Sequence, residues 1–320
     1  MGSATDLTSL ADLAAERLAQ IFGARPLLVQ LWQDNQTVSA ARGGEMSADM
    51  HVMPVHTGSR VAGEVVLDRK SEPGPDIESV LTELSAALTA LDAQQAIVRD
   101  RDQTMMALAR LATRGLDPGG HRPTRGAKIA REIGEQLVAA GLAPADAGWA
   151  QDLERAMTLR ELGRCLLPAD LWMKPGKLSE GEFELVRSLP DRAAALFDEL
   201  MPANDTAVRW HDLTRSILAG QGERWDGGGY PAGRKGESIP IEARIAAVVG
   251  AYDAMTRPRP YGVPRPHAAA LSQLTEESGA HFDPAVVRAL AARGTEVDRI
   301  RAAHTLAPEG DHELGDHRAA

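Results

Sequence analysis

Apolar positions near the start of the chain change from helical spacing to strand-like runs. One face of a helix over residues 5–22 would carry Leu10, Leu13, Ala14, Leu18 and Ile21. The runs PLLVQLWQ, TVSAAR, MHVMPVH and RVAGEVVLD follow, with glycine-containing turns between them. The first is apolar and branched, the second is weak, and the last two alternate. The pattern therefore predicts a helix followed by a small antiparallel sheet.

A long helical pattern begins after SEPGPD, where Asp76 follows Pro75 and can cap the helix. Its apolar residues recur every three to four positions, at Ile77, Leu81, Leu84, Leu88, Leu91, Val98 and Met105. We expect residues 73–114 to form a connecting helix whose narrow seam, 77–105, makes a coiled coil and hence a homodimer. The same spacing also suits a helix packed on its own domain.

The remaining apolar pattern is helical. TRGLDPGGHRPTRG, rich in glycine and proline, ends the long helix and marks a domain boundary. Runs such as KIAREIGEQLVAAGL and IEARIAAVVGAYDAMT then carry helical spacing, and no strand pattern competes with them. We therefore predict a helical domain over 115–300 and a mobile tail over 301–320, where the residues are polar and unpatterned.

Composition narrows the classes of function. The net charge of −10 and the pI of about 5.4 argue against a general nucleic-acid binder, which needs a basic surface. The single cysteine, Cys165, excludes a disulfide framework within the chain and favours a reducing compartment. The start of the sequence does not have the pattern of a signal peptide, and no stretch approaches the roughly 20 apolar residues of a membrane helix. We expect a cytoplasmic protein with no membrane partner.

Residues 1–72 resemble a short GAF-type sensory domain, in the segment MPVHTGSRVAGEVVL. The resemblance implies a small α/β domain that senses a signal. The alternative is a scaffold or dimerisation domain that binds no small molecule. With the helical half, the expected fold class is α+β: a GAF-like domain, a coiled-coil helix and an all-α bundle.

Four phrases of the helical half resemble the HD-GYP family, bacterial phosphodiesterases that cleave cyclic di-GMP. In chain order they are MKPGKLSEGEF, ERWDGGGYPAGRKGESIPIEARI, YDAMTRPRPY and GAHFDPAVV. The resemblance implies a helical bundle over 115–300. It also implies a site for two or three metal ions, usually iron or manganese, which activate a water and neutralise the phosphodiester.

This chain departs from the family where the resemblance places the metal ligands. Those positions hold Arg160, Leu189, Gln221, Gly222 and Gly250. Arginine has no lone pair for a metal and stays protonated. Only Glu161 is left as a ligand there, with Asp152 and Glu154 as neighbouring carboxylates. We therefore expect a degenerate HD-GYP domain with no metal, no cofactor and no catalytic residues, a pseudo-phosphodiesterase rather than an enzyme.

Three arginines are candidate ligand-binding residues. Arg164 keeps the charge of the family's motif lysine, and Arg259 lies on the arginine of its RPY phrase. With Arg160 they could bind the phosphates of cyclic di-GMP without a metal. The alternative is an internal Arg160–Glu161 ion pair with Arg164 in solvent.

The glycine-rich loop is a candidate partner-binding surface, through Trp225, Asp226, Gly229, Tyr230 and Pro231. The resemblance implicates this loop in docking to diguanylate cyclase (GGDEF) domains. The structural alternative is that Trp225 packs under the loop and Asp226 sets its turn. The expected function is regulation through protein–protein contact in cyclic dinucleotide signalling, without catalysis. The alternatives are a phosphodiesterase with an unusual metal site and a metal-free cyclic dinucleotide sensor.

Overall fold

The computed structural model describes most of the chain between residues 6 and 304. The described ranges are 6–23, 25–33, 36–45, 48–68, 75–114, 117, 121–146, 148–174, 176–201, 209–257 and 263–304, without the side chains of Val98 and Met173. The chain divides into two compact units, Met1–Arg101 and Asp102–Ala320. Each unit is described separately below.

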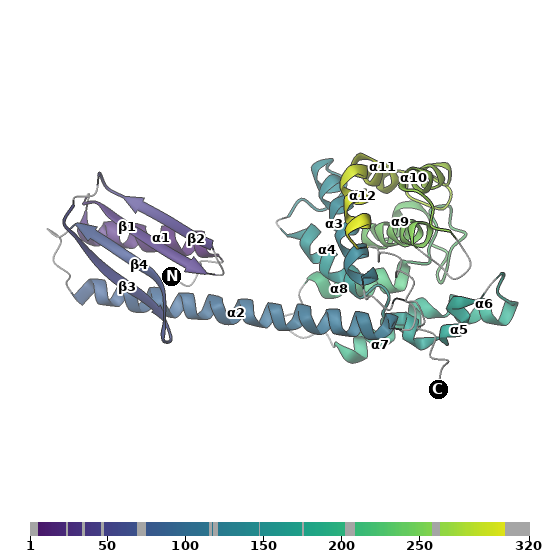
Figure 1. Ribbon diagram of the computed structural model, residues 1–320, viewed down its shortest axis with the longest axis horizontal. Coiled ribbons are helices and arrows are strands. Elements are labelled where there is room, and N and C mark those ends of the chain that lie inside the picture. Colours follow the sequence, from purple (N-terminus) through teal and green to yellow (C-terminus); the bar gives the residue numbers. More distant parts are fainter. Residues whose placement is uncertain are drawn as a thin grey trace, which may run out of the picture. The chain divides into compact units, whose positions relative to one another are not determined.

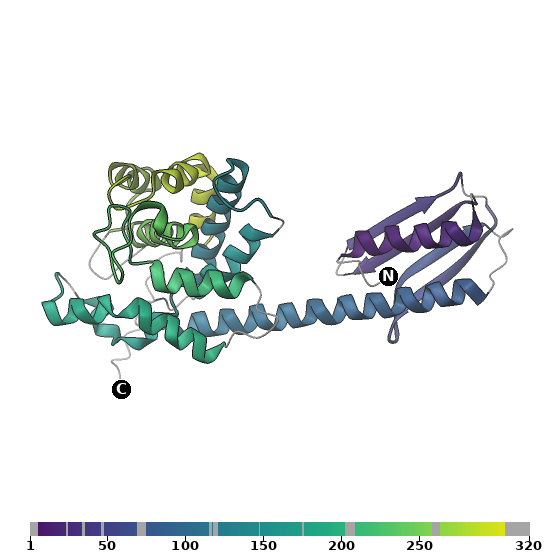
Figure 2. The same cartoon turned by 180° about the vertical axis from the view of Figure 1, so that it is seen from behind.

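The first unit is a four-stranded antiparallel sheet with helices packed on it. Its elements are α1 (Leu7–Phe22), β1 (Leu27–Gln33), β2 (Gln36–Arg42), β3 (Met50–Thr57) and β4 (Arg60–Asp68). The strand order is β2-β1-β4-β3, and Figures 1 and 2 show α1 against one face of the sheet. Alternate β1 residues Leu27, Val29 and Leu31 are buried in a core shared with α1. The alternation expected for a half-buried strand is thus present.

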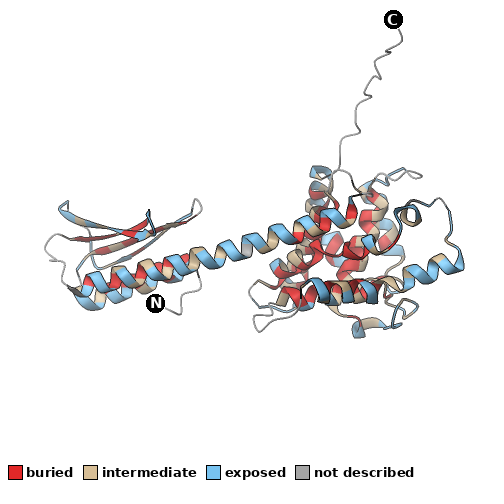
Figure 3. Cartoon of the chain, turned by 90° about the horizontal axis from the view of Figure 1, so that it is seen from below, coloured by how far each residue is buried: buried red, intermediate tan, exposed pale blue. Residues whose placement is uncertain are grey.

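Apolar seam residues of the long helix α2 (Pro75–Thr113) pack in the cores of the two units. Ile77, Leu84 and Leu88 belong to the core of the first unit, and Met105 belongs to a core of the second. Figure 3 shows buried residues towards the two ends of α2, with mostly exposed residues between them. The predicted coiled coil is therefore wrong. The sequence could not exclude it, because a helix–helix seam and a helix packed on its own domain have the same apolar spacing. The homodimer itself stays a prediction.

The second unit is helical. Its further elements are α3 (Arg122–Ala139), α4 (Trp149–Thr158), η1 (Leu162–Leu166), α5 (Ala169–Met173), α6 (Glu180–Arg187), α7 (Leu189–Leu200), α8 (Arg209–Gly220), η2 (Gly236–Ser238), α9 (Ile241–Thr256), α10 (His267–Glu276), α11 (Pro284–Ala292) and α12 (Gly294–Ala303). Helix α9 lies at its centre and contacts α3, α8, α10 and α11 (Figure 1). Ile245, Val249 and Tyr252 on α9 are fully buried, as a helix covered on most sides requires.

These findings correct the predicted fold class. The described chain is mostly helical with one small sheet, rather than α+β with a coiled-coil connector. The helices after residue 115 fit an HD-type domain, whereas the GAF likeness of the first unit is not shown. Helix α12 continues to Ala303 with His304 after it, and residues 305–320 of the predicted tail lie outside the described residues. No helix in the described ranges is both long and apolar enough to cross a membrane.

Core packing of α2 is tested by two truncations on the same helix. Leu84→Ala should lower the free energy of unfolding of the first unit by about 2–5 kcal/mol, because Leu84 is fully buried. Ile97→Ala is the control, since Ile97 is 70% exposed and should leave stability nearly unchanged. Urea denaturation followed by circular dichroism measures both. Equal effects of the two changes would contradict the internal packing of α2.

Candidate functional site

The turn between α4 and η1 brings three charged side chains to one place. Leu159 and Leu162 point into an apolar core of the second unit and anchor the turn. Arg160 and Glu161 lie between them and are 9% and 3% exposed. Arg164 follows in η1, three residues after Glu161, and pairs with it. Local helical spacing therefore sets the Glu161–Arg164 contact, while the leucines set the direction of the turn.

Glu161 is surrounded by guanidinium groups. It pairs with Arg122 of α3 at 3.0 Å and also with Arg160 and Arg164. Burial would raise the pKa of Glu161, but the charges of these arginines outweigh it and hold the pKa well below its usual range. Glu161 is therefore an ionised carboxylate held in the interior by its cationic neighbours.

A second carboxylate, Asp253 of α9, extends the cluster. It accepts hydrogen bonds from Arg125 of α3, with Nε at 2.8 Å, and lies 3.3 Å from Arg122 and 3.6 Å from Arg257. Arg122 thus joins both carboxylates and ties α3 to α9 and to the η1 turn. The cluster is a cross-link between segments that are far apart in the sequence.

Positive charge exceeds negative charge in this cluster. Leaving Arg257 aside, the four arginines Arg122, Arg125, Arg160 and Arg164 face only Glu161 and Asp253 within ion-pair distance among the described residues, an excess of at least two positive charges. Burial lowers the pKa of Arg164, as do the charges of Arg122 and Arg160, and Glu161 opposes them. A buried cation in excess is costly, so an anion bound here would be stabilised.

A cavity of about 160 Å³ opens on this cluster. We call it the arginine cavity, and its walls include Arg160, Glu161, Arg164, Trp172, Gln221 and Tyr230. The structure thus brings together two of the three predicted ligand-binding arginines and one residue of the glycine-rich loop. Arg259, the third arginine, lies outside the described residues.

The residues at the expected metal positions do not fit a divalent cation. A Cβ on Gly250 would lie 2.6 Å from Nη1 of Arg160, so the guanidinium fills the space that a larger side chain at position 250 needs. Gln221 donates its amide to the carbonyl oxygen of Arg160 at 3.3 Å. The carboxylates of Glu161 and Asp253 are engaged by arginines. In the described part of the chain, no three histidine, cysteine or acidic side chains group as metal ligands would.

The carboxylates that were candidates for an unusual metal site are paired elsewhere. Asp152 binds Arg155 at 3.1 Å and Arg209 at 2.7 Å. Glu154 binds Arg131 at 3.1 Å. The structure therefore does not bring them to Glu161.

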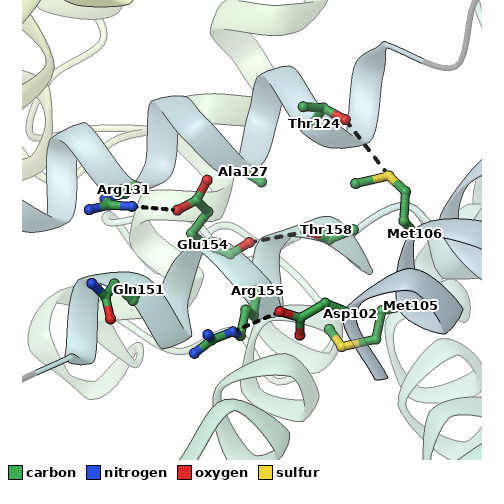
Figure 4. Close-up of a pocket in the computed structure, with 10 residues that line it drawn as sticks. All are labelled: Asp102, Met105, Met106, Thr124, Ala127, Arg131, Gln151, Glu154, Arg155 and Thr158. Carbon is green, nitrogen blue, oxygen red and sulfur yellow. Dashed lines mark hydrogen bonds and ion pairs between the residues drawn. The ribbon is translucent and has the colours of Figure 1, made fainter. Parts of the chain in front are cut away.

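A larger cavity, of about 420 Å³, lies between the end of α2, α3 and α4. Figure 4 shows two ion pairs on its walls, Arg131–Glu154 and Arg155–Asp102, and two methionines from α2. Both of its arginines have carboxylate partners, at 3.1 and 3.3 Å. The smaller arginine cavity is therefore the better candidate for an anion site, despite its volume.

The glycine-rich loop is held in one shape by contacts that the sequence did not reveal. Glu223, which is buried, accepts the backbone N–H groups of Ala232 and Arg234, both at 2.9 Å. A Cβ on Gly229 would lie 2.3 Å from the backbone nitrogen of Arg224, so only glycine fits there. The acidic first residue of the ERWDGG phrase was the available signal for this role of Glu223.

The predicted partner-binding residues divide between the loop surface and the interior. Asp226 and Pro231 are exposed, and Asp226 accepts the N–H of Gly228 at 2.9 Å, as expected for a turn. Tyr230 lines the arginine cavity and meets Phe183 edge-on at 6.2 Å, and burial raises its pKa. Trp225 lies 5.7 Å from the guanidinium of Arg244. Tyr230 thus forms part of the cavity wall.

Comparison with known proteins places the second unit in a family. A family model described as HD domain matches residues 92–286. The chain belongs to the HD domain family. The resemblance drawn from the four sequence phrases is confirmed at this level, while the degenerate status is not shown.

Several curated relatives are similar to part of the chain. A cyclic di-GMP phosphodiesterase of Vibrio cholerae is 31% identical over 214 residues, which cover 64% of the chain and 42% of the relative. A cyclic di-GMP phosphodiesterase response regulator of Xanthomonas campestris pv. campestris is 35% identical over 148 residues, 46% of the chain and 38% of the relative. A 3′3′-cGAMP-specific phosphodiesterase of Vibrio cholerae is 30% identical over 162 residues, 51% of the chain and 29% of the relative. The chain thus spans less than half the length of these relatives.

Solved structures give weaker likenesses. A cyclic GMP-AMP-specific phosphodiesterase of Vibrio cholerae has a TM-score of 0.46 at 19% identity, covering 64% of the chain and 51% of that protein. An HDGYP protein of Bdellovibrio bacteriovorus has a TM-score of 0.42 at 12% identity, covering 84% and 94%. At these TM-scores the two structures add nothing to the assignment.

The prediction that the chain is not an enzyme is contradicted by the curated relatives. Relatives at 31–37% identity over part of the chain are named cyclic di-GMP phosphodiesterases. That prediction was based on the residue types at the expected metal positions, most of which cannot bind a metal. The arginine cluster still does not fit a divalent metal, so no metal-based step follows from this geometry.

The charge balance of the cluster predicts a pH-dependent loss of stability. Glu161→Gln leaves Arg122, Arg160 and Arg164 without that carboxylate, and should cost about 3–5 kcal/mol at pH 7. The lowered pKa means that ionised Glu161 stabilises the fold fully above its ordinary pKa of 4.5 and progressively less as the pH falls below that value. Denaturation at several pH values should therefore show the gap between wild type and variant narrowing below about pH 4.5.

The control for that variant is Glu296→Gln, which removes a glutamate that is 33% exposed and also pairs with an arginine three residues on. It should leave the free energy of unfolding nearly unchanged. A gap between wild type and Glu161→Gln that stays constant down to pH 3 would contradict the ionised state of Glu161.

The shape of the loop is tested at Gly229. Gly229→Ala should displace the loop, because the added Cβ meets backbone atoms that cannot move aside, and we expect a cost of about 1–3 kcal/mol. Hydrogen exchange should show reduced protection of the Ala232 and Arg234 amides that Glu223 accepts. Gly181→Ala, where nothing lies within 4 Å of the new Cβ, is the control. Unchanged protection in Gly229→Ala would overturn this account of the loop.

Proposed function

We propose that the chain acts in cyclic dinucleotide signalling by binding a cyclic dinucleotide through Arg160 and Arg164. The excess of buried positive charge at the arginine cavity carries this proposal. The names of the relatives support the choice of ligand, since they refer to cyclic di-GMP and to 3′3′-cGAMP. A phosphodiester group supplies the anion that the cluster lacks.

The free donors of Arg164 support this proposal. Its Nε donates to Glu161, and neither Nη has a hydrogen-bond partner among the described residues. Arg164 also lines the cavity and is 19% exposed, so its outer edge reaches the open space. A guanidinium edge with two N–H groups matches two oxygens of a phosphate. Binding of this kind does not depend on a divalent cation.

Hydrolysis of a cyclic dinucleotide is the second candidate function, favoured by the names of the relatives. Docking of the glycine-rich loop to a partner such as a GGDEF domain, and a cytoplasmic setting, stay predictions. Tyr230 lines the cavity in the first proposal, so docking would depend on the exposed residues Asp226 and Pro231.

Calorimetric titration with cyclic di-GMP in the presence of a chelator tests the first proposal. Wild type should bind, and Arg164→Ala should weaken binding by about 1.5–3 kcal/mol, roughly 10- to 150-fold, as for a lost hydrogen bond to a charged group. Arg299→Ala is the matched control, because Arg299 also pairs with a glutamate three residues before it but is exposed. Its affinity should equal that of wild type.

The same samples separate binding from turnover. Chromatography of the reaction with added manganese detects linear products, and their formation would establish the second candidate. Binding that appears only with manganese, or that Arg164→Ala leaves unchanged, would overturn the first proposal.

A further inference from the structure

Trp172 contacts both the guanidinium group and the backbone of Arg164. The guanidinium carbon of Arg164 lies 4.4 Å from the centre of the Trp172 ring. The indole N–H of Trp172 donates to the backbone carbonyl oxygen of Arg164 at 3.2 Å. One side chain, carried by the five-residue helix α5, therefore fixes both the backbone and the charged group of Arg164.

The kind of contact matters for the donors of Arg164. A carboxylate partner uses N–H groups in the plane of the guanidinium, as Glu161 does with Nε. An aromatic ring below the guanidinium attracts the cation through its face and uses none of those N–H groups. Trp172 thus restrains the side chain while its outer edge stays available to a ligand.

Trp172 is also placed outside the apolar cores. In the described part of the second unit, the core clusters include Trp149 and Trp210 but not Trp172. Trp172 instead lines the arginine cavity beside Arg164. A large ring in this position is better explained by its neighbour than by core packing.

We propose that Trp172 is a positioning residue that holds the Arg164 guanidinium flat, with its Nη edge towards the arginine cavity. This inference rests on the proposed binding of a cyclic dinucleotide. An unrestrained arginine loses rotamer freedom when it binds a phosphate, and a restrained one has lost it already. Trp172 therefore raises affinity through Arg164.

Affinity for cyclic di-GMP in two Trp172 variants tests this role. Trp172→Leu removes the ring and the N–H group and should weaken binding roughly tenfold, within the range of cation–π contacts. Trp172→Phe keeps a ring face and should retain most of the affinity. Trp32→Leu is the control, because Trp32 also donates its indole N–H to a backbone carbonyl, that of Val61, but in the first unit. Thermal unfolding of each variant gives the folded fraction.

A double-mutant cycle shows whether Trp172 acts through Arg164. In an Arg164→Ala background, Trp172→Leu should cause no further loss of affinity, because the restrained group is gone. An equal loss in both backgrounds, or wild-type affinity in Trp172→Leu alone, would overturn the inference.

A ligand-independent measurement separates this inference from the proposed function. In the protein without ligand, the NMR signal of the Arg164 Nε–H group should carry a ring-current shift that disappears in Trp172→Leu and remains in Trp172→Phe. If wild type binds no cyclic di-GMP, the proposed function fails while this shift still tests the contact. If the shift is absent from wild type, the positioning role fails whatever the binding data show.

Discussion

The second unit depends on two buried carboxylates that are surrounded by arginines. Arg122 pairs with both Glu161 and Asp253, so a single side chain connects α3, α9 and the turn before η1. Ion pairs of this kind add little net stability compared with well-packed apolar groups, but loss of one partner is costly. The cluster therefore constrains which substitutions the unit can accept, and its excess positive charge sets what the arginine cavity can bind.

Small residues around the cluster make room for the large ones. Gly250 leaves the space that the guanidinium of Arg160 fills, and a Cβ on Gly222 would lie 2.7 Å from the ring of Tyr230. Arg160 thus depends on Gly250, which is distant in the sequence, while Tyr230 depends on Gly222 of its own loop. The packing around Arg160 therefore suits an arginine at this position, and the positive charge at this point is that of its side chain.

Periodicity predicted the helices of the second unit well, because an amphipathic pattern is a local property. It failed for the coiled coil, since the Ile77–Leu88 face has one spacing whether it meets a second chain or its own sheet. The predicted alternative of an Arg160–Glu161 ion pair is present, but Arg164 is not in solvent. Arg122 and Arg125 could not be assigned to the site, because Arg125 is 128 residues from its partner Asp253. Tyr230 was predicted as a partner-binding residue of the loop, but its ring lies against Gly222 and lines the cavity.

The folded chain tolerates the excess charge because the exposure of the arginines increases from the interior of the cluster to the cavity. Arg122 and Arg125, which are almost fully buried, share Asp253, while Arg164 is the more exposed arginine and lies at the cavity. Water can hydrate the outer edge of Arg164 when no ligand is bound, which reduces the cost of the charge that the carboxylates leave uncompensated. An anion that enters the cavity replaces that water and meets donors already held by Glu161 and Trp172. Under the binding proposal, the site is therefore stable when empty and accepts a phosphate without any change in the buried part of the cluster.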